Sequence, residues 1–130
     1  MQNTAIWWIR RDLRLADNLA LTKALQEAEH VAAVFILDPV LLRSPYVGEK
    51  RLTFLFAGLM ELDESLRQRG GRLIIRKGDP ITELGHMLAE TGAQSIYAEA
   101  DFSAYARKRD QRASARFPIH WTGLPVVHPP

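Results

Sequence analysis

The feature that most constrains the fold is an uninterrupted apolar run over residues 31–37. A strand with water on one side alternates apolar and polar residues, whereas this run is apolar at every position. We therefore expect a central strand of a parallel sheet, covered on both faces. Asp38 and Pro39 end it, because proline disfavours helix at the preceding residue and lacks the N–H that a sheet ladder requires.

Similar apolar runs recur along the chain and alternate with segments of helical periodicity. Strands are predicted over residues 5–9, 31–37, 72–76, 95–99 and 118–121, and helices over residues 18–29, 48–69, 80–90 and 103–116. This alternation predicts a doubly wound three-layer α/β/α sandwich, Rossmann-like, with a five-stranded parallel sheet and right-handed crossovers. The expected strand order is 3-2-1-4-5, which puts the first and fourth strands side by side.

The 130 residues are expected to form one domain, residues 1–130, which is long enough to bury a core. Prolines break the tail, residues 123–130, which we interpret as irregular and as the start of an interdomain linker. The absence of cysteine excludes disulfides and thiolate metal sites and fits a cytoplasmic protein. No apolar run approaches the length of a membrane span, so a soluble protein without membrane contacts is expected.

The segment over residues 48–69 is the longest predicted helix, and leucines follow one side of it. The stripe consists of Leu52, Leu55, Leu59, Leu62 and Leu66. Steps of three and four residues place these side chains on one face, and burying them is worth roughly 8–15 kcal/mol before entropy is counted. We interpret the stripe as core, with Arg51, Phe54 and Gly58 on a flanking line.

No self-contained catalytic centre or metal site can be read from the sequence. The four histidines (His30, His86, His120 and His128) are scattered, without the spacing that metal ligands show. No serine lies on a strand-to-helix elbow, and no glycine-rich phosphate loop is present. In the segment Gly78-Asp79-Pro80 we interpret Asp79 as a helix cap and Pro80 as the first helical residue.

A ligand crevice is predicted where the first strand ends. The chain turns from apolar to charged at Arg10 and restarts as a helix behind Asp17, which we expect to be the N-cap. In doubly wound sheets, ligands bind at the carboxyl ends where the strand order reverses. The crevice would lie between residues 10–17 and residues 99–103. The alternative is a solvated turn, in which the charged residues Arg10, Arg11, Asp12 and Arg14 pair among themselves.

Polar residues at or near the ends of the second and fourth strands suit a flat heteroaromatic ligand. Asp38, Arg51 and Asp101 are the polar groups, and Phe35 and Phe54 would supply an apolar wall. In the alternative interpretation Asp38 is a turn former, Arg51 a surface charge and Phe54 ordinary core.

Basic residues gather in the last predicted helix, which raises the question of nucleic-acid binding. The set is Arg107, Lys108, Arg109, Arg112 and Arg116. Asp110 interrupts it, the charges surround the helix, and the net charge of the chain is only +2, so a solvated helix is favoured.

The residues from Trp8 to Leu21, Trp-x-Arg-x-Asp-Leu-Arg-Leu-x-Asp-Asn-x-Ala-Leu, resemble the opening of the DNA photolyase/cryptochrome family. The resemblance continues over nearly the whole chain. It includes Phe35-Ile-Leu-Asp-Pro, Arg51-Leu-Thr-Phe-Leu, Gly78-Asp-Pro, the segment from Tyr97 to Asp110 and the exit His128-Pro-Pro. It covers only the N-terminal domain of that family.

The resemblance implies a light-harvesting domain that holds an antenna chromophore: 8-hydroxy-5-deazaflavin, methenyltetrahydrofolate or a flavin. Phe35, Asp38, Arg51, Leu52 and Asp101 would line its pocket, and Arg51 and Asp101 would hydrogen-bond its polar edge. A C-terminal helical domain would hold the catalytic FAD and contact DNA, where light-driven electron transfer splits cyclobutane pyrimidine dimers. No catalytic residue is expected in this chain, which alone would not act as the carbon–carbon lyase.

Two other functions are open at this point. A cryptochrome-type module would use the same sheet domain for blue-light signalling through protein contacts. A stand-alone nucleotide-binding α/β domain would require the glycine-rich phosphate loop that the sequence lacks.

Overall fold

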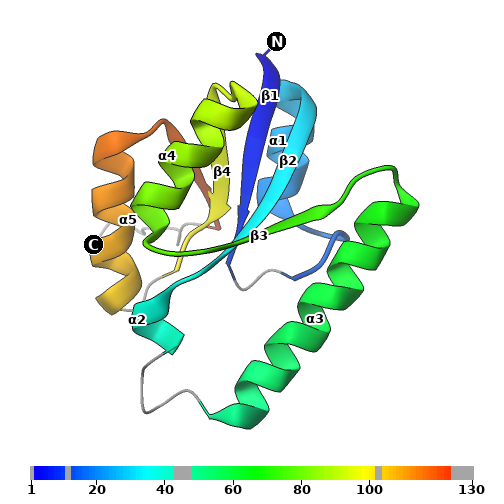
Figure 1. The fold of residues 1–130 in the computed structure, drawn as a ribbon. Helices are drawn as coiled ribbons and strands as arrows, with labels where there is room; N and C mark the ends of the chain where they lie inside the picture. The colour runs from blue at the N-terminus through cyan, green and yellow to red at the C-terminus, as the bar shows by residue number, and fades with distance from the viewer. Residues whose placement is uncertain (1, 11–12, 43–47, 102–103, 124–130) are drawn as a thin grey trace, which may run out of the picture.

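The structure is a computed structural model that describes residues 2–10, 13–42, 48–101 and 104–123. Its elements, in chain order, are β1 (Gln2–Ile9), α1 (Leu19–Glu27), β2 (Ala28–Leu37), α2 (Pro39–Leu42), α3 (Glu49–Gln68), β3 (Leu73–Lys77), α4 (Pro80–Thr91), β4 (Ser95–Glu99), α5 (Ala104–Arg116) and β5 (Ile119–Thr122). The five strands form one parallel sheet in the order β3-β2-β1-β4-β5 (Figure 1). The predicted fold class and strand order are confirmed.

Helices cover both faces of the sheet, and each face has its own core. Trp7 and Phe35 face α1 and α3, where they pack with Leu59 and Leu62. The side chain of Trp8 points the opposite way, to the core formed with α4 and α5. This division follows from the strand period, since neighbouring side chains alternate between faces. β1 is central, and its residues from Ala5 to Ile9 are all buried.

Several element boundaries differ from the sequence prediction. Asn18, not Asp17, caps α1: its side chain accepts a hydrogen bond from the Leu21 N–H at 3.0 Å. Asp17 lies in the preceding turn with φ 52°, a left-handed conformation that short polar residues tolerate. β2 begins at Ala28 rather than residue 31, and β3 and β5 each lie one residue later than predicted.

A short helix was missed where a loop was expected. Helix α2 follows β2 directly, and the Asp38 side chain accepts a hydrogen bond from the Val40 N–H at 2.9 Å. The predicted cap of α4 is confirmed, because the Asp79 side chain accepts from the Thr82 N–H at 3.1 Å and Pro80 is the first helical residue. Gly92 ends α4 with φ 68°.

Helix α3 packs on the sheet mainly through its C-terminal half. Leu59 and Leu62 of the leucine stripe are buried, whereas Leu52, Leu55 and Leu66 are half-buried. Figure 1 shows the N-terminal end of α3 extending past the sheet. At Gly58 a Cβ atom would lie 3.0 Å from a methyl carbon of Leu13, so the absence of a side chain there lets the segment after β1 approach the helix.

No helix in the described ranges is both long and apolar enough to cross a membrane.

Candidate functional site

The candidate site lies at the carboxyl ends of β1 and β4, where the strand order reverses. These two strands pair in parallel, with Trp8 opposite Ala98. The crossovers from β1 lead toward β2 and β3, while β4 and β5 extend the sheet on the other side. Arg10 follows β1 directly, and Ala100 and Asp101 follow β4. This is the place where doubly wound sheets bind ligands.

Arg10 spans the boundary between the two strands on the α5 side. Its Nη1 donates hydrogen bonds of 2.9 Å to the Glu99 carbonyl oxygen and of 2.9 Å to Oδ2 of Asp110. The guanidinium carbon lies 5.0 Å from the ring centre of Trp8 and 5.3 Å from that of Trp121. Only 5% of the Arg10 side chain is exposed. The Arg10 guanidinium therefore fills this part of the space at the ends of β1 and β4, where the strand order reverses.

The charges around Arg10 are unusual because they are buried. Burial lowers the pKa of Arg10, and the neighbouring positive charge of Arg109 lowers it further, while Asp110 and Asp101 oppose both effects. Burial likewise raises the pKa of Asp110, against the influence of Arg10. Arg109 lies 5.3 Å from the Trp8 ring and is only 12% exposed. Removing one partner from such a buried group leaves an uncompensated charge, which is strongly destabilising.

The solvated-turn interpretation of Arg10 is therefore wrong, and so is the solvated interpretation of Arg109. The sequence does contain a signal for the burial of Arg10. Side chains two residues apart on a strand point to the same face, and Arg10 is two residues after the buried Trp8. Arg11 and Asp12, which belong to the same predicted loop, lie outside the described residues.

Asp101 lies on the α5 side of the sheet. It borders a cavity of about 320 Å³ that is lined by Ala100, Asp101, Arg107, Asp110, Gln111, Ser114 and Trp121. Its carboxylate is close enough to raise the pKa of Arg10. The predicted loop partners at residues 102–103 lie outside the described residues.

The other four predicted residues come from β2 and α3. Phe35 is 8% exposed and belongs to the core beneath α3. Asp38 is buried at the end of β2, where it caps α2. Arg51 and Leu52 lie in the first turn of α3, with Arg51 exposed and Leu52 half-buried. Phe35 thus faces α3, whereas Asp101 borders a cavity on the α5 side of the sheet.

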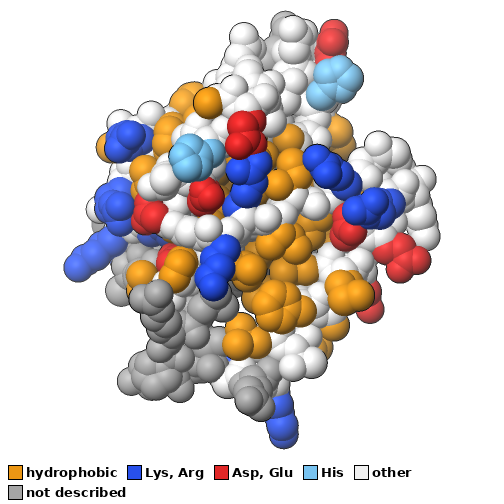
Figure 2. Space-filling model, in the orientation of Figure 1, with side chains coloured by type: hydrophobic (Ala, Val, Ile, Leu, Met, Phe, Trp, Pro, Cys, Tyr) orange, Lys and Arg blue, Asp and Glu red, His pale blue; other side chains and the backbone are white. Residues whose placement is uncertain are grey.

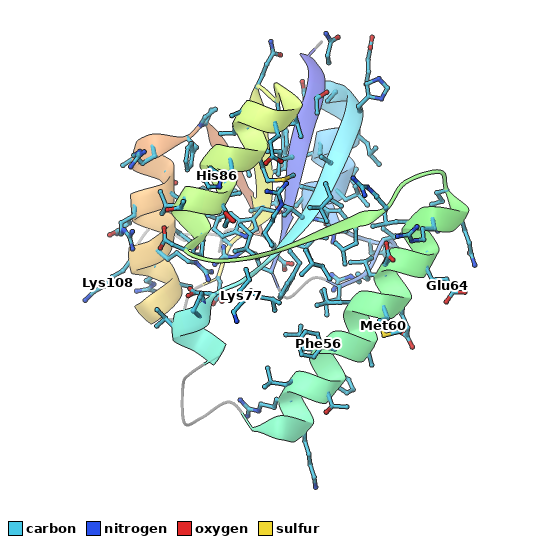
Figure 3. The ribbon with its side chains drawn as sticks, viewed as in Figure 1. Phe56, Met60, Glu64, Lys77, His86 and Lys108 are labelled. Atoms are coloured by element: carbon cyan, nitrogen blue, oxygen red, sulfur yellow. The ribbon has the colours of Figure 1, made fainter. Side chains whose placement is uncertain are left out.

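Phe54 does not form the predicted apolar wall. Its side chain is 83% exposed on α3, so it is neither wall nor core in the isolated chain. Phe56, also on α3, is 43% exposed, and Figure 3 shows it on the side of the helix toward Lys77.

The sheet is only partly covered at the carboxyl ends of β2 and β3. Ile75 pairs with Phe35 and faces the same side, yet 48% of Ile75 is exposed because α3 diverges from the sheet here. Figure 2 shows hydrophobic side chains gathered between α3 and β3. This part of the sheet therefore keeps apolar surface exposed on β3, next to the end of β2 where Asp38 is buried.

Metal chemistry finds no support in the described ranges, where no three His, Asp or Glu side chains gather as a metal site would require.

The parallel pairing and the strand order, which reverses between β1 and β4, define a doubly wound α/β domain. The sequence profile of DNA photolyase matches residues 5–127. The chain therefore belongs to the DNA photolyase family.

Curated relatives include both photolyases and cryptochromes. The chain is 40% identical over 110 residues to a deoxyribodipyrimidine photo-lyase of Streptomyces griseus, covering 85% of this chain and 24% of that protein. It is 37% identical over 106 residues to cryptochrome-2 of Gallus gallus, covering 82% of this chain and 18% of that protein. An uncharacterized 31.6 kDa protein of Synechococcus sp. is 36% identical, with 96% of this chain and 46% of that protein covered. The chain thus spans less than half the length of each of these relatives.

Solved structures show the same fold. An archaeal photolyase from Sulfolobus tokodaii matches with a TM-score of 0.82 and 33% identity, covering 91% of this chain and 28% of that one. That protein holds two FAD molecules, which imply a novel light-harvesting cofactor. A class III photolyase from Agrobacterium tumefaciens matches with a TM-score of 0.84 and 27% identity, covering 93% and 26% of the two chains.

Proposed function

We propose that the chain is the N-terminal antenna domain of a deoxyribodipyrimidine photolyase. The observation that carries this proposal is the partly uncovered apolar floor at Phe35 and Ile75, in a chain of the DNA photolyase family. Apolar surface is normally buried in a domain of this size, and here it remains open beside buried and charged polar groups.

The residues of the chain would hold the chromophore by stacking and by hydrogen bonds. Phe35 and Leu52 would supply the apolar contact, and Phe56, exposed on α3, is a further aromatic side chain that could reach the ring system. The exposed guanidinium of Arg51 has five N–H donors for a carbonyl or carboxylate at the ring edge. When bound, the chromophore absorbs light and passes the excitation energy to the catalytic FAD of the C-terminal domain.

Asp38 and Asp101 would have different parts. Asp38 accepts the Val40 N–H, and its carboxylate would also accept an N–H or O–H of the ligand. Asp101 would accept a hydrogen bond from the polar edge of the chromophore on the α5 side of the sheet. This contact requires the chromophore to extend past the end of β1. A ligand held only by the β2 and α3 residues would make Asp101 dispensable.

The chromophore is one of three classes: 8-hydroxy-5-deazaflavin, methenyltetrahydrofolate or a flavin. The similarity to the Sulfolobus tokodaii photolyase with two FAD molecules makes FAD the first to test. In the parent protein, the C-terminal FAD domain would contact DNA and carry out dimer splitting.

Titration of the purified chain with each chromophore, followed by absorbance and fluorescence, tests the proposal. Saturable binding of one chromophore is expected, and Arg51→Ala should weaken it by about tenfold or more, as the loss of a charged hydrogen bond does. Arg72→Ala, which removes an exposed arginine next to β3, is the matched control. Absence of any spectral change, or equal weakening by both variants, would refute this site.

A signalling cryptochrome is the second candidate, favoured by the 37% identity to cryptochrome-2. Light-dependent repair of pyrimidine dimers by the full-length protein distinguishes the two. Repair supports the photolyase, and chromophore binding by a full-length protein without repair supports the cryptochrome.

A further inference from the structure

The backbone that leads into Asp101 is held from both neighbouring strands. The register between β1 and β4 ends one residue before Glu99. Beyond that point a side chain connects the two strands, because Nη1 of Arg10 donates a hydrogen bond of 2.9 Å to the Glu99 carbonyl oxygen. On the β5 side, the Ala100 N–H donates to the Thr122 carbonyl oxygen at 2.8 Å. The two residues before Asp101 are thus tied to β1 and to β5.

The guanidinium of Arg10 is itself fixed on its other sides. The same Nη1 donates at 2.9 Å to Oδ2 of Asp110 in α5. The guanidinium carbon lies 5.0 Å from the ring centre of Trp8 and 5.3 Å from that of Trp121. Only 5% of the Arg10 side chain is exposed, so it can act on a bound ligand only through its neighbours.

Charge also connects Arg10 to Asp101. The Asp101 carboxylate is close enough to oppose the effects that lower the pKa of Arg10. Asp101 and Asp110 line the same cavity of about 320 Å³. Like charges that share one cavity repel each other unless a cation is close to both. Without Arg10, we therefore expect the Asp101 side chain to turn away from Asp110.

We propose that Arg10 is a positioning residue for the chromophore. It holds the end of β4 so that the Asp101 carboxylate accepts a hydrogen bond from the polar edge of the ring system. This role rests on the antenna function proposed for the chain, and it adds Arg10 to the predicted site residues. The ligand contact belongs to Asp101, whereas Arg10 fixes the acceptor before the ligand arrives, which reduces the entropy lost on binding.

A double-mutant cycle separates this role from a purely structural one. FAD, 8-hydroxy-5-deazaflavin and methenyltetrahydrofolate are titrated in turn into the purified chain. Asp101→Ala should raise the Kd of the chromophore that binds by about tenfold, as the loss of a charged hydrogen bond does. The pair variant Arg10→Met with Asp110→Leu removes both buried charges and should raise Kd by about fivefold.

The combined variant carries all three substitutions. Its Kd should also be about tenfold above that of the parent, because Arg10 then has no acceptor left to position. Independent effects would instead multiply to about fiftyfold. Circular dichroism checks that each variant is folded. If the pair variant does not fold, Arg10→Gln with Asp110→Asn replaces it, since these shorter or neutral side chains also remove the charge and the contact with Glu99.

The absorption spectrum of the bound chromophore is a second readout, and a loss of stability alone does not move it. At saturation, the pair variant should displace the absorption maximum in the same direction as Asp101→Ala, and the combined variant no further than Asp101→Ala. Met87→Ala is the matched control, because Met87 is fully buried in the core that contains Trp8. It should leave the maximum unchanged and Kd within about twofold, with or without Asp101→Ala.

The outcomes distinguish this role from the antenna function itself. A combined variant about fiftyfold weaker than the parent, or a pair variant that binds as tightly as the parent, would overturn the positioning role and leave the antenna function intact. Unchanged binding by Asp101→Ala, together with weaker binding by Arg51→Ala, would do the same. A parent chain that binds none of the three chromophores would refute the antenna function, and the role of Arg10 with it.

Discussion

Two regions at the same edge of the sheet are built in opposite ways. At the ends of β1 and β4, Arg10 and Asp110 form a buried ion pair between aromatic rings, and the chain fills the switch point itself. At the ends of β2 and β3, α3 diverges and leaves Ile75 half exposed above Phe35. The closed region fixes the geometry of the edge, and the open region leaves apolar surface available for the ligand that we propose.

The largest expected effect is the removal of Arg10 from the closed region. Arg10→Ala would leave Asp110 with a buried, poorly compensated charge, which costs about 3–5 kcal/mol of unfolding free energy. Urea denaturation measures it. The double variant Arg10→Met with Asp110→Leu removes both charges and should be clearly more stable than Arg10→Ala. A loss below about 1 kcal/mol for Arg10→Ala would mean that the pair behaves as an exposed one.

The second test contrasts two phenylalanines of the open region. Phe35→Ala should lower the unfolding free energy by about 3 kcal/mol, because the ring belongs to the core beneath α3. Phe54→Ala should change it by less than about 0.5 kcal/mol at low protein concentration, because that ring is exposed. Similar losses for both variants would show that α3 packs against the sheet over its whole length.

The smallest effect concerns the attachment of α3 to β3. The Leu73 N–H donates to Oδ1 of Asp63 at 2.9 Å, and Arg67 Nε donates to Oδ2. These two contacts hold the pKa of Asp63 below its usual value. Because the pKa is lower in the folded state, Asp63 stabilises the fold above the unfolded-state pKa, and this contribution disappears as pH falls through the folded-state pKa.

With Asp63→Asn, the unfolding free energy should therefore fall less steeply as the pH is lowered, which is to say that the acid limb of the stability curve becomes flatter. Urea midpoints between about pH 6 and about pH 2 measure the change. Glu64→Gln, an exposed position on the same helix, is the control and should leave the limb as steep as in the parent. An acid limb that is unchanged in Asp63→Asn would show that the anchor at Leu73 does not depend on charge.

The fold could be predicted because each strand and helix carries its own period in the sequence. Residues 31–37 lie in an interior strand for that reason. The alternation predicted a doubly wound sheet, and the order 3-2-1-4-5 expected for it is the one observed. Helix α2 could not be found, because four residues are too few to show a period. Asp17 and Asn18 are adjacent and both are good capping residues, so the sequence does not decide which of them caps α1. The backbone decides, because Asp17 has a left-handed φ and Asn18 has the extended conformation of an N-cap.

The candidate site was less predictable, because its parts meet only through tertiary packing. Phe35 and Asp38 could be placed, since both belong to one strand and its end. The burial of Arg10 depends on Asp110, which lies one hundred residues later in the chain. The exposure of Phe54 depends on the angle at which α3 leaves the sheet, and residue spacing within a helix contains no such angle.

The ion pair between Arg10 and Asp110 also has a consequence during synthesis of the protein. β1 is synthesised about one hundred residues before its ion-pair partner, so Arg10 at its end lacks Asp110 until residue 110 has emerged from the ribosome. Its neighbour β4 is equally late. Nascent chains that stop short of α5 therefore lack the carboxylate that pairs with Arg10 in the middle of the sheet, and α5 completes this buried contact at the end of β1.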